Sequence, residues 1–155
     1  MSALRLGALA LGALALSAVM SYVAPSGLRL DPLLVVAVLA ALGGRRGTAI
    51  GAGLLTGLLE DAWVRDLFGQ RAFTHMVAAY AVALLGSRLD LTQTFPAAAA
   101  YAAATVADWG LQIGLAALFD RPVGELPGVG IWTAAAVGNM LLGLALGSAV
   151  GRPRS

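Results

Sequence analysis

Six apolar runs, separated by short charged or helix-breaking segments, restrict this chain to one broad class of fold. Hydrophobic residues fill 59% of its 155 positions and charged residues only 12%, about half of the roughly 25% found in soluble domains. Apolar runs of about 20 residues match the roughly 30 Å hydrocarbon core of a bilayer. We therefore expect an all-α integral membrane protein, a bundle of six transmembrane helices forming a single domain over residues 1–155.

The second of these runs is shorter than the others. The expected spans cover residues 4–24, 32–42, 47–64, 72–86, 95–119 and 129–150. The apolar part of the second would measure only about 18 Å at 1.5 Å per residue. Asp31-Pro32 is a typical helix start, with Asp as the N-cap and Pro in the first turn. Either this helix begins earlier, near Leu28, or the bilayer is thinner around it.

The arginines indicate an orientation. With six spans both termini share one face, which has six arginines against four on the other. The first face carries Arg5, Arg45, Arg46, Arg88, Arg152 and Arg154, and the second carries Arg29, Arg65, Arg71 and Arg121. The positive-inside rule then places both termini in the cytoplasm. The first 24 residues also resemble a signal peptide, but the long apolar run without a clean Ala-x-Ala site favours an uncleaved span.

Several functional classes are disfavoured by what the sequence lacks. A net charge of +2, dispersed along the chain, does not predict nucleic-acid binding. With no cysteine and one histidine, we expect no metal site and no cofactor. The chain has no Walker A loop, Gly-x-Ser-x-Gly elbow or His-Glu-x-x-His helix. The loops are short, and we expect a protein that is not an enzyme.

Three polar residues fall inside the fifth and sixth spans. Asp108 and Gln112 share a helical face, and Asn139 lies at a similar depth in the next span. A charge at the bilayer centre costs about 2.5–3.5 kcal/mol on insertion scales, so Asp108 should face the bundle interior, within reach of Asn139. The main interpretation is a structural polar clamp; the alternatives are a solute site or a proton path. A proton path normally needs a second titratable group at that depth, and Asp108 is the one expected there.

A second polar cluster is expected at the outer ends of the third and fourth spans. Its members are carboxylates and bases that surround the connecting loop: Glu60, Asp61, Arg65, Arg71 and His75. We interpret them as helix caps and ion pairs that lock the hairpin. Small-xxx-small spacings, which let helix backbones approach closely, mark further packing positions at Gly53, Gly57, Gly143 and Gly147.

One segment also carries a family resemblance. The run Gly53-Leu-Leu-Thr-Gly57-Leu-Leu-Glu60-Asp61, a short polar turn with Gly69, and a helix with Ala79-Tyr80 resemble the rod shape-determining protein MreD family. The Pro-led segment after Asp31 is similar to the second span of that family, and the length and hydropathy profile match over almost the whole chain. Glu60 departs from the pattern, because an apolar residue usually precedes the family's Asp, and the turn is unusually charged.

The resemblance implies a non-catalytic subunit of the bacterial cell-elongation machinery, in the inner membrane. MreD-like proteins partner MreC, and the complex works with MreB, RodA and a class B penicillin-binding protein in peptidoglycan synthesis. The family's six-helix fold resembles the substrate-binding subunits of energy-coupling-factor transporters. A vitamin-binding transporter subunit is therefore the alternative function, and an ion or proton channel through Asp108 is a third.

Overall fold

The computed structural model of the chain describes residues 3–23, 30–63, 68–120 and 128–150, and its regular structure there is entirely helical. The helices are α1 (Ala3–Val23), α2 (Pro32–Ala41), α3 (Arg46–Trp63), α4 (Gln70–Gly86), α5 (Thr94–Leu118) and α6 (Val129–Val150). The expected all-α class is confirmed. The helix ends lie within two residues of the expected spans, because apolar runs and the charged breaks between them are strong signals.

α2 begins where its capping residues predict. The Asp31 carboxylate accepts a 2.7 Å hydrogen bond from the Leu34 amide, and Pro32 occupies the first helical position. Leu28 lies outside the described residues, but Leu30 and Asp31 are not helical, so α2 itself does not start there.

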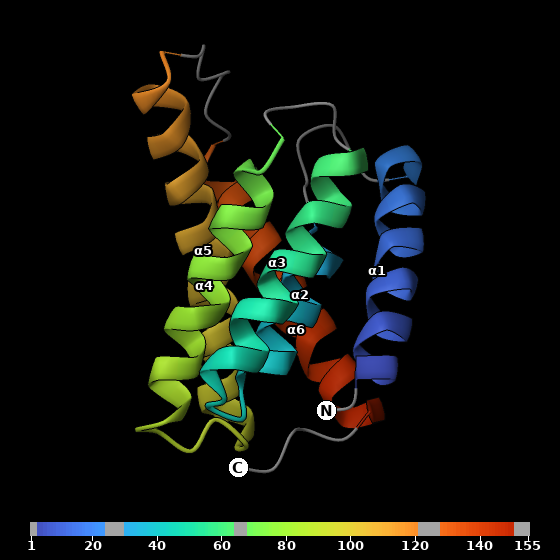
Figure 1. Ribbon diagram of the computed structural model, residues 1–155, viewed down its shortest axis with the longest axis vertical. Helices are drawn as coiled ribbons and strands as arrows, with labels where there is room; N and C mark the ends of the chain where they lie inside the picture. Colours follow the sequence, from blue (N-terminus) through green and yellow to red (C-terminus); the bar gives the residue numbers. More distant parts are fainter. Residues whose placement is uncertain (1–2, 24–29, 64–67, 121–127, 151–155) are drawn as a thin grey trace.

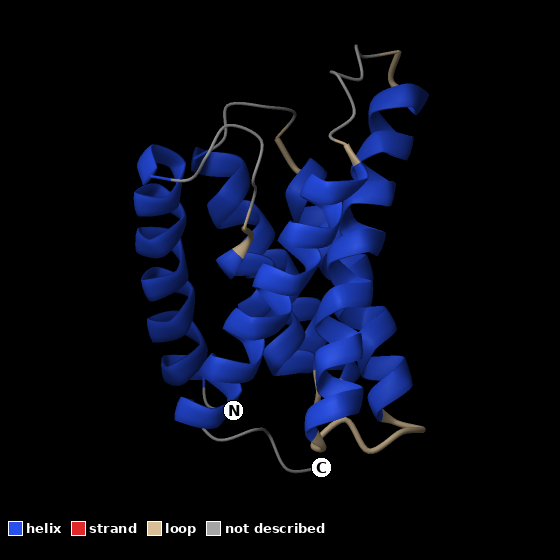
Figure 2. Ribbon diagram, turned by 180° about the vertical axis from the view of Figure 1, so that it is seen from behind, coloured by secondary structure: helices blue, strands red, loops and turns tan. Residues whose placement is uncertain are grey.

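α2 is the axis of the bundle. All ten of its residues are buried, and it contacts each of the other five helices. The remaining helices lie around it in the order α1, α3, α4, α5 and α6, with their axes running in a common direction (Figures 1 and 2). A helix that is apolar on every side is stable where it is enclosed. The shortness of α2 therefore needs no thinner bilayer as its explanation, because the neighbouring helices enclose all ten of its residues.

The tightest packing joins α3 to α4. A Cβ atom added at Gly53 would lie 2.6 Å from the Met76 Cα, and one added at Gly57 would overlap the Ala72 Cα and the Arg71 carbonyl oxygen. The two backbones are therefore in direct contact along this seam. On α6, a Cβ at Gly143 would lie 2.5 Å from the ring of Tyr101 on α5, and Gly147 is buried on the same helix.

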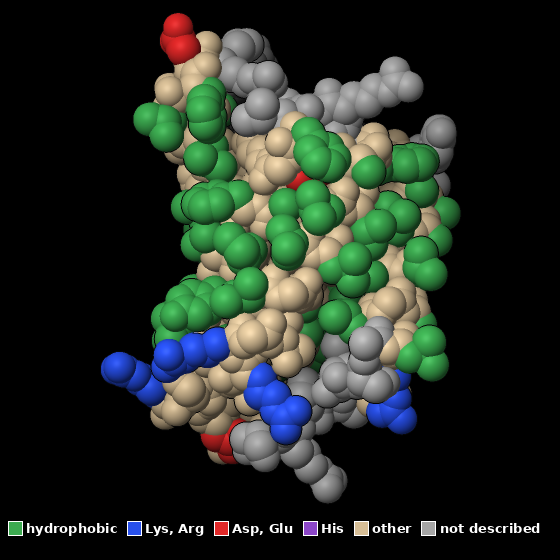
Figure 3. All heavy atoms as spheres, in the orientation of Figure 1, with side chains coloured by type: hydrophobic (Ala, Val, Ile, Leu, Met, Phe, Trp, Pro, Cys, Tyr) green, Lys and Arg blue, Asp and Glu red, His purple; other side chains and the backbone are tan. Residues whose placement is uncertain are grey.

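The outer surface is apolar with one basic end. Large hydrophobic side chains are exposed on each helix around α2, including Leu11, Leu54, Phe73, Val106 and Leu141. Figure 3 shows hydrophobic side chains over much of the visible face and exposed basic side chains at the lower end, where α1 and α3 begin and α4 ends. Among the described helices, α1 (over Leu4–Ser21) and α6 are long and apolar enough to cross a membrane.

Candidate functional site

Four helices bring acidic and basic side chains together beside the first turn of α2. Asp31 caps α2, Glu60 lies in the last turn of α3, Arg71 and His75 lie near the start of α4, and Asp108 comes from α5. Side-chain exposure is 0% for His75 and Asp108, 7% for Asp31 and 15% for Glu60. We call these five residues the buried polar network.

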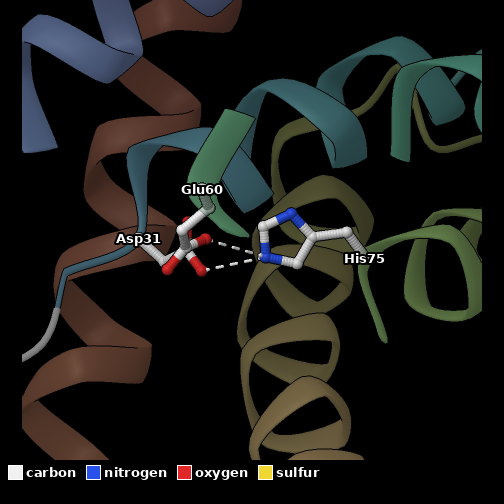
Figure 4. Close-up of side chains that lie close together, drawn as sticks. All are labelled: Asp31, Glu60 and His75. Carbon is white, nitrogen blue, oxygen red and sulfur yellow. Dashed lines mark hydrogen bonds and ion pairs between the residues drawn. The ribbon is translucent and has the colours of Figure 1, made fainter. Parts of the chain in front are cut away.

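His75 is the centre of the buried polar network (Figure 4). Its Nε2 lies 3.1 Å from Oδ2 of Asp31 and 3.3 Å from Oε2 of Glu60, and 4.0 Å from Oδ1 of Asp108. Arg71 contacts the other oxygen of Glu60, with 2.9 Å between Nη1 and Oε1, and lies 4.0 Å from Asp31. One imidazole nitrogen thus faces carboxylates from three different helices.

The opposite ring nitrogen of His75 contacts α3. Its Nδ1 lies 3.3 Å from the hydroxyl oxygen of Thr56, and that hydroxyl lies 3.0 Å from the Ala52 carbonyl oxygen. A helical threonine commonly donates its hydrogen to the carbonyl four residues earlier. The Thr56 oxygen then accepts a hydrogen bond from Nδ1–H, which fixes the ring orientation and leaves Nε2 facing the carboxylates.

Asp61 has a separate role from its neighbour Glu60. Its carboxylate accepts hydrogen bonds from three backbone amides at the start of α4: Gly69 at 2.9 Å, Arg71 at 3.0 Å and Ala72 at 3.0 Å. Gly69 adopts a φ of +94°, a conformation that favours glycine. The expected hairpin cluster therefore divides in two: Glu60, Arg71 and His75 join the buried polar network, Asp61 caps α4, and Arg65 lies outside the described residues.

Asp108 and Asn139 are both buried, as expected, but their hydrogen bonds go to other partners. Asp108 accepts a hydrogen bond from Gln112, one turn later on α5. Asn139 accepts a 2.9 Å bond from the Asp31 amide and donates a 3.1 Å bond to the Thr105 hydroxyl. Asn139 therefore ties α6 to the start of α2 and to α5, in place of binding the carboxylate.

The sequence suggested that Asp108 is the only titratable group at its depth, and this prediction is wrong. α5 extends beyond the first turn of α4 (Figure 1), so residues well inside α5 lie level with His75. Asp31 was expected only as a helix cap, yet it belongs to the buried polar network. The signal that could have found it is its position: a carboxylate directly before a helix apolar on every side must be buried with that helix.

Comparison with protein-family models, with curated proteins and with solved structures finds no match for this chain.

Proposed function

We propose that this chain is a non-catalytic subunit of the MreD type, embedded in the bacterial inner membrane by six spans with both termini in the cytoplasm. The observation that carries the proposal is the α3–α4 hairpin. The residues of the family resemblance are those that build it: Gly53 and Gly57 bring the two helices into contact, Asp61 binds the first amides of α4, and Gly69 makes the turn.

The surface supports embedding in a membrane. α1 and α6 have the length and composition of membrane spans, and the other helices share their direction (Figure 1). The exposed surface between the two ends is apolar, and large exposed apolar surfaces in soluble monomers are rare. Arg5, Arg45, Arg46 and Arg88 are exposed at one end, which the positive-inside rule assigns to the cytoplasm.

The interior supports a subunit rather than a vitamin carrier. A solute site needs polar groups that converge on an open cavity. Here the interior is filled by α2, and the polar residues expected to hold a solute bind one another: Gln112 binds Asp108, and Asn139 binds Asp31 and Thr105. These bonds also argue against a channel, because they occupy the polar groups that would line it.

The role that follows is to bind and position other membrane proteins. MreC is the proposed direct partner, with RodA, a class B penicillin-binding protein and MreB reached through it, and lipid around the rest of the bundle. In this role the protein contributes to cell shape by regulating peptidoglycan synthesis.

Co-purification tests this proposal. The tagged chain is extracted in mild detergent from membranes that also contain MreC, and the eluate is analysed by native mass spectrometry. We expect a complex with MreC. The matched variant Gly57→Leu, which forces α3 from α4, should lose MreC, whereas Gly51→Leu on the exposed side of α3 should retain it or lose it only partly. A chain that elutes without MreC, or with a bound vitamin, contradicts the proposal.

A further inference from the structure

We propose that the buried polar network holds a binding site for one divalent transition-metal cation, with Zn²⁺ the best fit, coordinated by Asp31, Glu60 and His75. The site is independent of the proposed partnership with MreC, and either proposal can fail alone. These three ligands leave one position of a tetrahedral ion open.

The spacing of the ligand atoms matches tetrahedral coordination. Ligands about 2.05 Å from a zinc ion lie about 3.3 Å from one another. Nε2 of His75 lies 3.1 Å from Oδ2 of Asp31 and 3.3 Å from Oε2 of Glu60, and these three ligand atoms all lie within 4.8 Å of one another. One imidazole nitrogen with carboxylate oxygens is a donor set suited to zinc.

A third carboxylate lies beside these ligands. Asp108 is fully buried, and its Oδ1 has no hydrogen-bond partner although it lies 4.0 Å from Nε2 of His75. Oε2 of Glu60 likewise has no hydrogen bond and faces Nε2. Buried carboxylate oxygens rarely remain without a partner. A cation bound by Glu60 would give its Oε2 the partner it lacks, and Asp108 would place a further negative charge beside the site.

The tautomer of His75 also favours a cation at Nε2. Because Nδ1–H donates to Thr56, a neutral ring directs the lone pair of Nε2 at two carboxylates. That arrangement is repulsive unless Nε2 carries a proton or a metal cation lies between these groups. Metal-binding histidines usually donate their second N–H to a protein acceptor, as His75 does to the Thr56 oxygen.

The charges of the network accommodate a dication. With Asp31, Glu60 and Asp108 ionised, three negative charges face one permanent positive charge on Arg71. A dication beside neutral His75 then brings the network to zero net charge. Uncompensated charge in a low-dielectric interior is costly. Arg71 and Gln112 bind the outer oxygens of Glu60 and Asp108, as groups around a metal site commonly do.

Metal analysis of the purified full chain tests the site. The protein is purified in detergent without chelator and assayed by inductively coupled plasma mass spectrometry, and it is then stripped with EDTA and titrated with Zn²⁺. We expect about one zinc per chain and a Tm increase of about 5 °C or more at saturation. In His75→Gln and Asp108→Asn, the zinc affinity should fall at least about tenfold. Asp90→Asn, an exposed carboxylate far along the chain, is the matched control and should bind like wild type.

Cobalt spectroscopy of the wild type keeps the test decisive if the variants fail to fold. Co²⁺ bound to the stripped protein should give the intense visible bands of a tetrahedral ion. The proposal is overturned if wild type binds less than about 0.1 equivalent of Zn²⁺, if Co²⁺ shows only the spectrum of the hydrated ion, or if folded His75→Gln binds zinc as tightly as Asp90→Asn.

Discussion

The imidazole of His75 lies 3.1 Å from the carboxylate of Asp31, although the two residues are 44 positions apart in the chain. This contact joins α4 to the cap of α2, the helix around which the bundle is built. Glu60 and Asp108 approach the same nitrogen from α3 and α5. His75 of α4 thus contacts residues from α2, α3 and α5. Its removal should weaken the packing of all four helices.

His75→Ala should destabilise the fold by about 3–5 kcal/mol, because it leaves buried carboxylates facing one another. Single polar contacts between membrane helices average only about 0.6 kcal/mol, but several contacts are lost here at once. Unfolding in detergent, followed by circular dichroism, measures the effect. Arg88→Ala, at an exposed position, is the control and should change stability by less than about 0.5 kcal/mol. Equal stability of the two variants would refute the role given to His75.

Gly57→Ala should weaken the α3–α4 seam by about 1–3 kcal/mol or more, since its Cβ would overlap the backbone of α4. Gly51→Ala on the same helix has open space around the added carbon, and alanine favours a helix by roughly 0.5–1 kcal/mol over glycine. The two substitutions are chemically identical and should have opposite signs. Melting curves of both proteins in one detergent compare them, and a stabilised Gly57→Ala would show that the helices are not in contact.

Asp61→Ala should free three amides at the start of α4 and cost about 2 kcal/mol. Hydrogen exchange read by mass spectrometry should show faster exchange at Gly69, Arg71 and Ala72. Amides in the last turns of α4 should exchange at the wild-type rate. Uniform acceleration along α4, or none, would contradict the capping role.

Asp90, in the exposed turn between α4 and α5, should titrate below its ordinary pKa of 3.8. The Thr92 hydroxyl, the Thr92 amide and the Gln93 side chain all donate hydrogen bonds to its charged form and lower the pKa. A lowered folded-state pKa contributes stability at neutral pH, which is lost as the pH falls through that pKa. A carboxyl ¹³C titration measures the pKa of Asp90. The substitution Thr92→Val, which removes the hydroxyl, should raise this pKa. A wild-type value at or above 3.8 would contradict these bonds.

Helix positions in this chain are local properties, and the sequence predicts them well. Pro32, Gly69 and the charged breaks end or start helices whatever surrounds them, so the expected ranges differ little from the observed ones. The enclosure of α2 is less evident, because an apolar run of ten residues looks the same against lipid as against protein.

The composition of the buried polar network depended on contacts that no local pattern encodes. Glu60, Arg71 and His75 were grouped because they flank one hairpin. Asp31 and Asp108 join them only because α2 and α5 are folded against that hairpin. Asn139 was expected near the Asp108 carboxylate, but it binds the Asp31 amide and the Thr105 hydroxyl, because depth in a span does not specify which neighbour a side chain faces.

Single-cysteine labelling tests the central claim, a six-span bundle whose arginine-rich end lies in the cytoplasm, most directly. The chain has no cysteine, so Ser87→Cys at the arginine-rich end and Asp120→Cys after α5 each give one thiol. Intact cells are treated with a membrane-impermeant maleimide, and lysed cells serve as the reference. We predict that Asp120→Cys labels in intact cells and Ser87→Cys only after lysis. Labelling of both thiols in intact cells, or of Ser87→Cys alone, would contradict the proposed arrangement in the membrane.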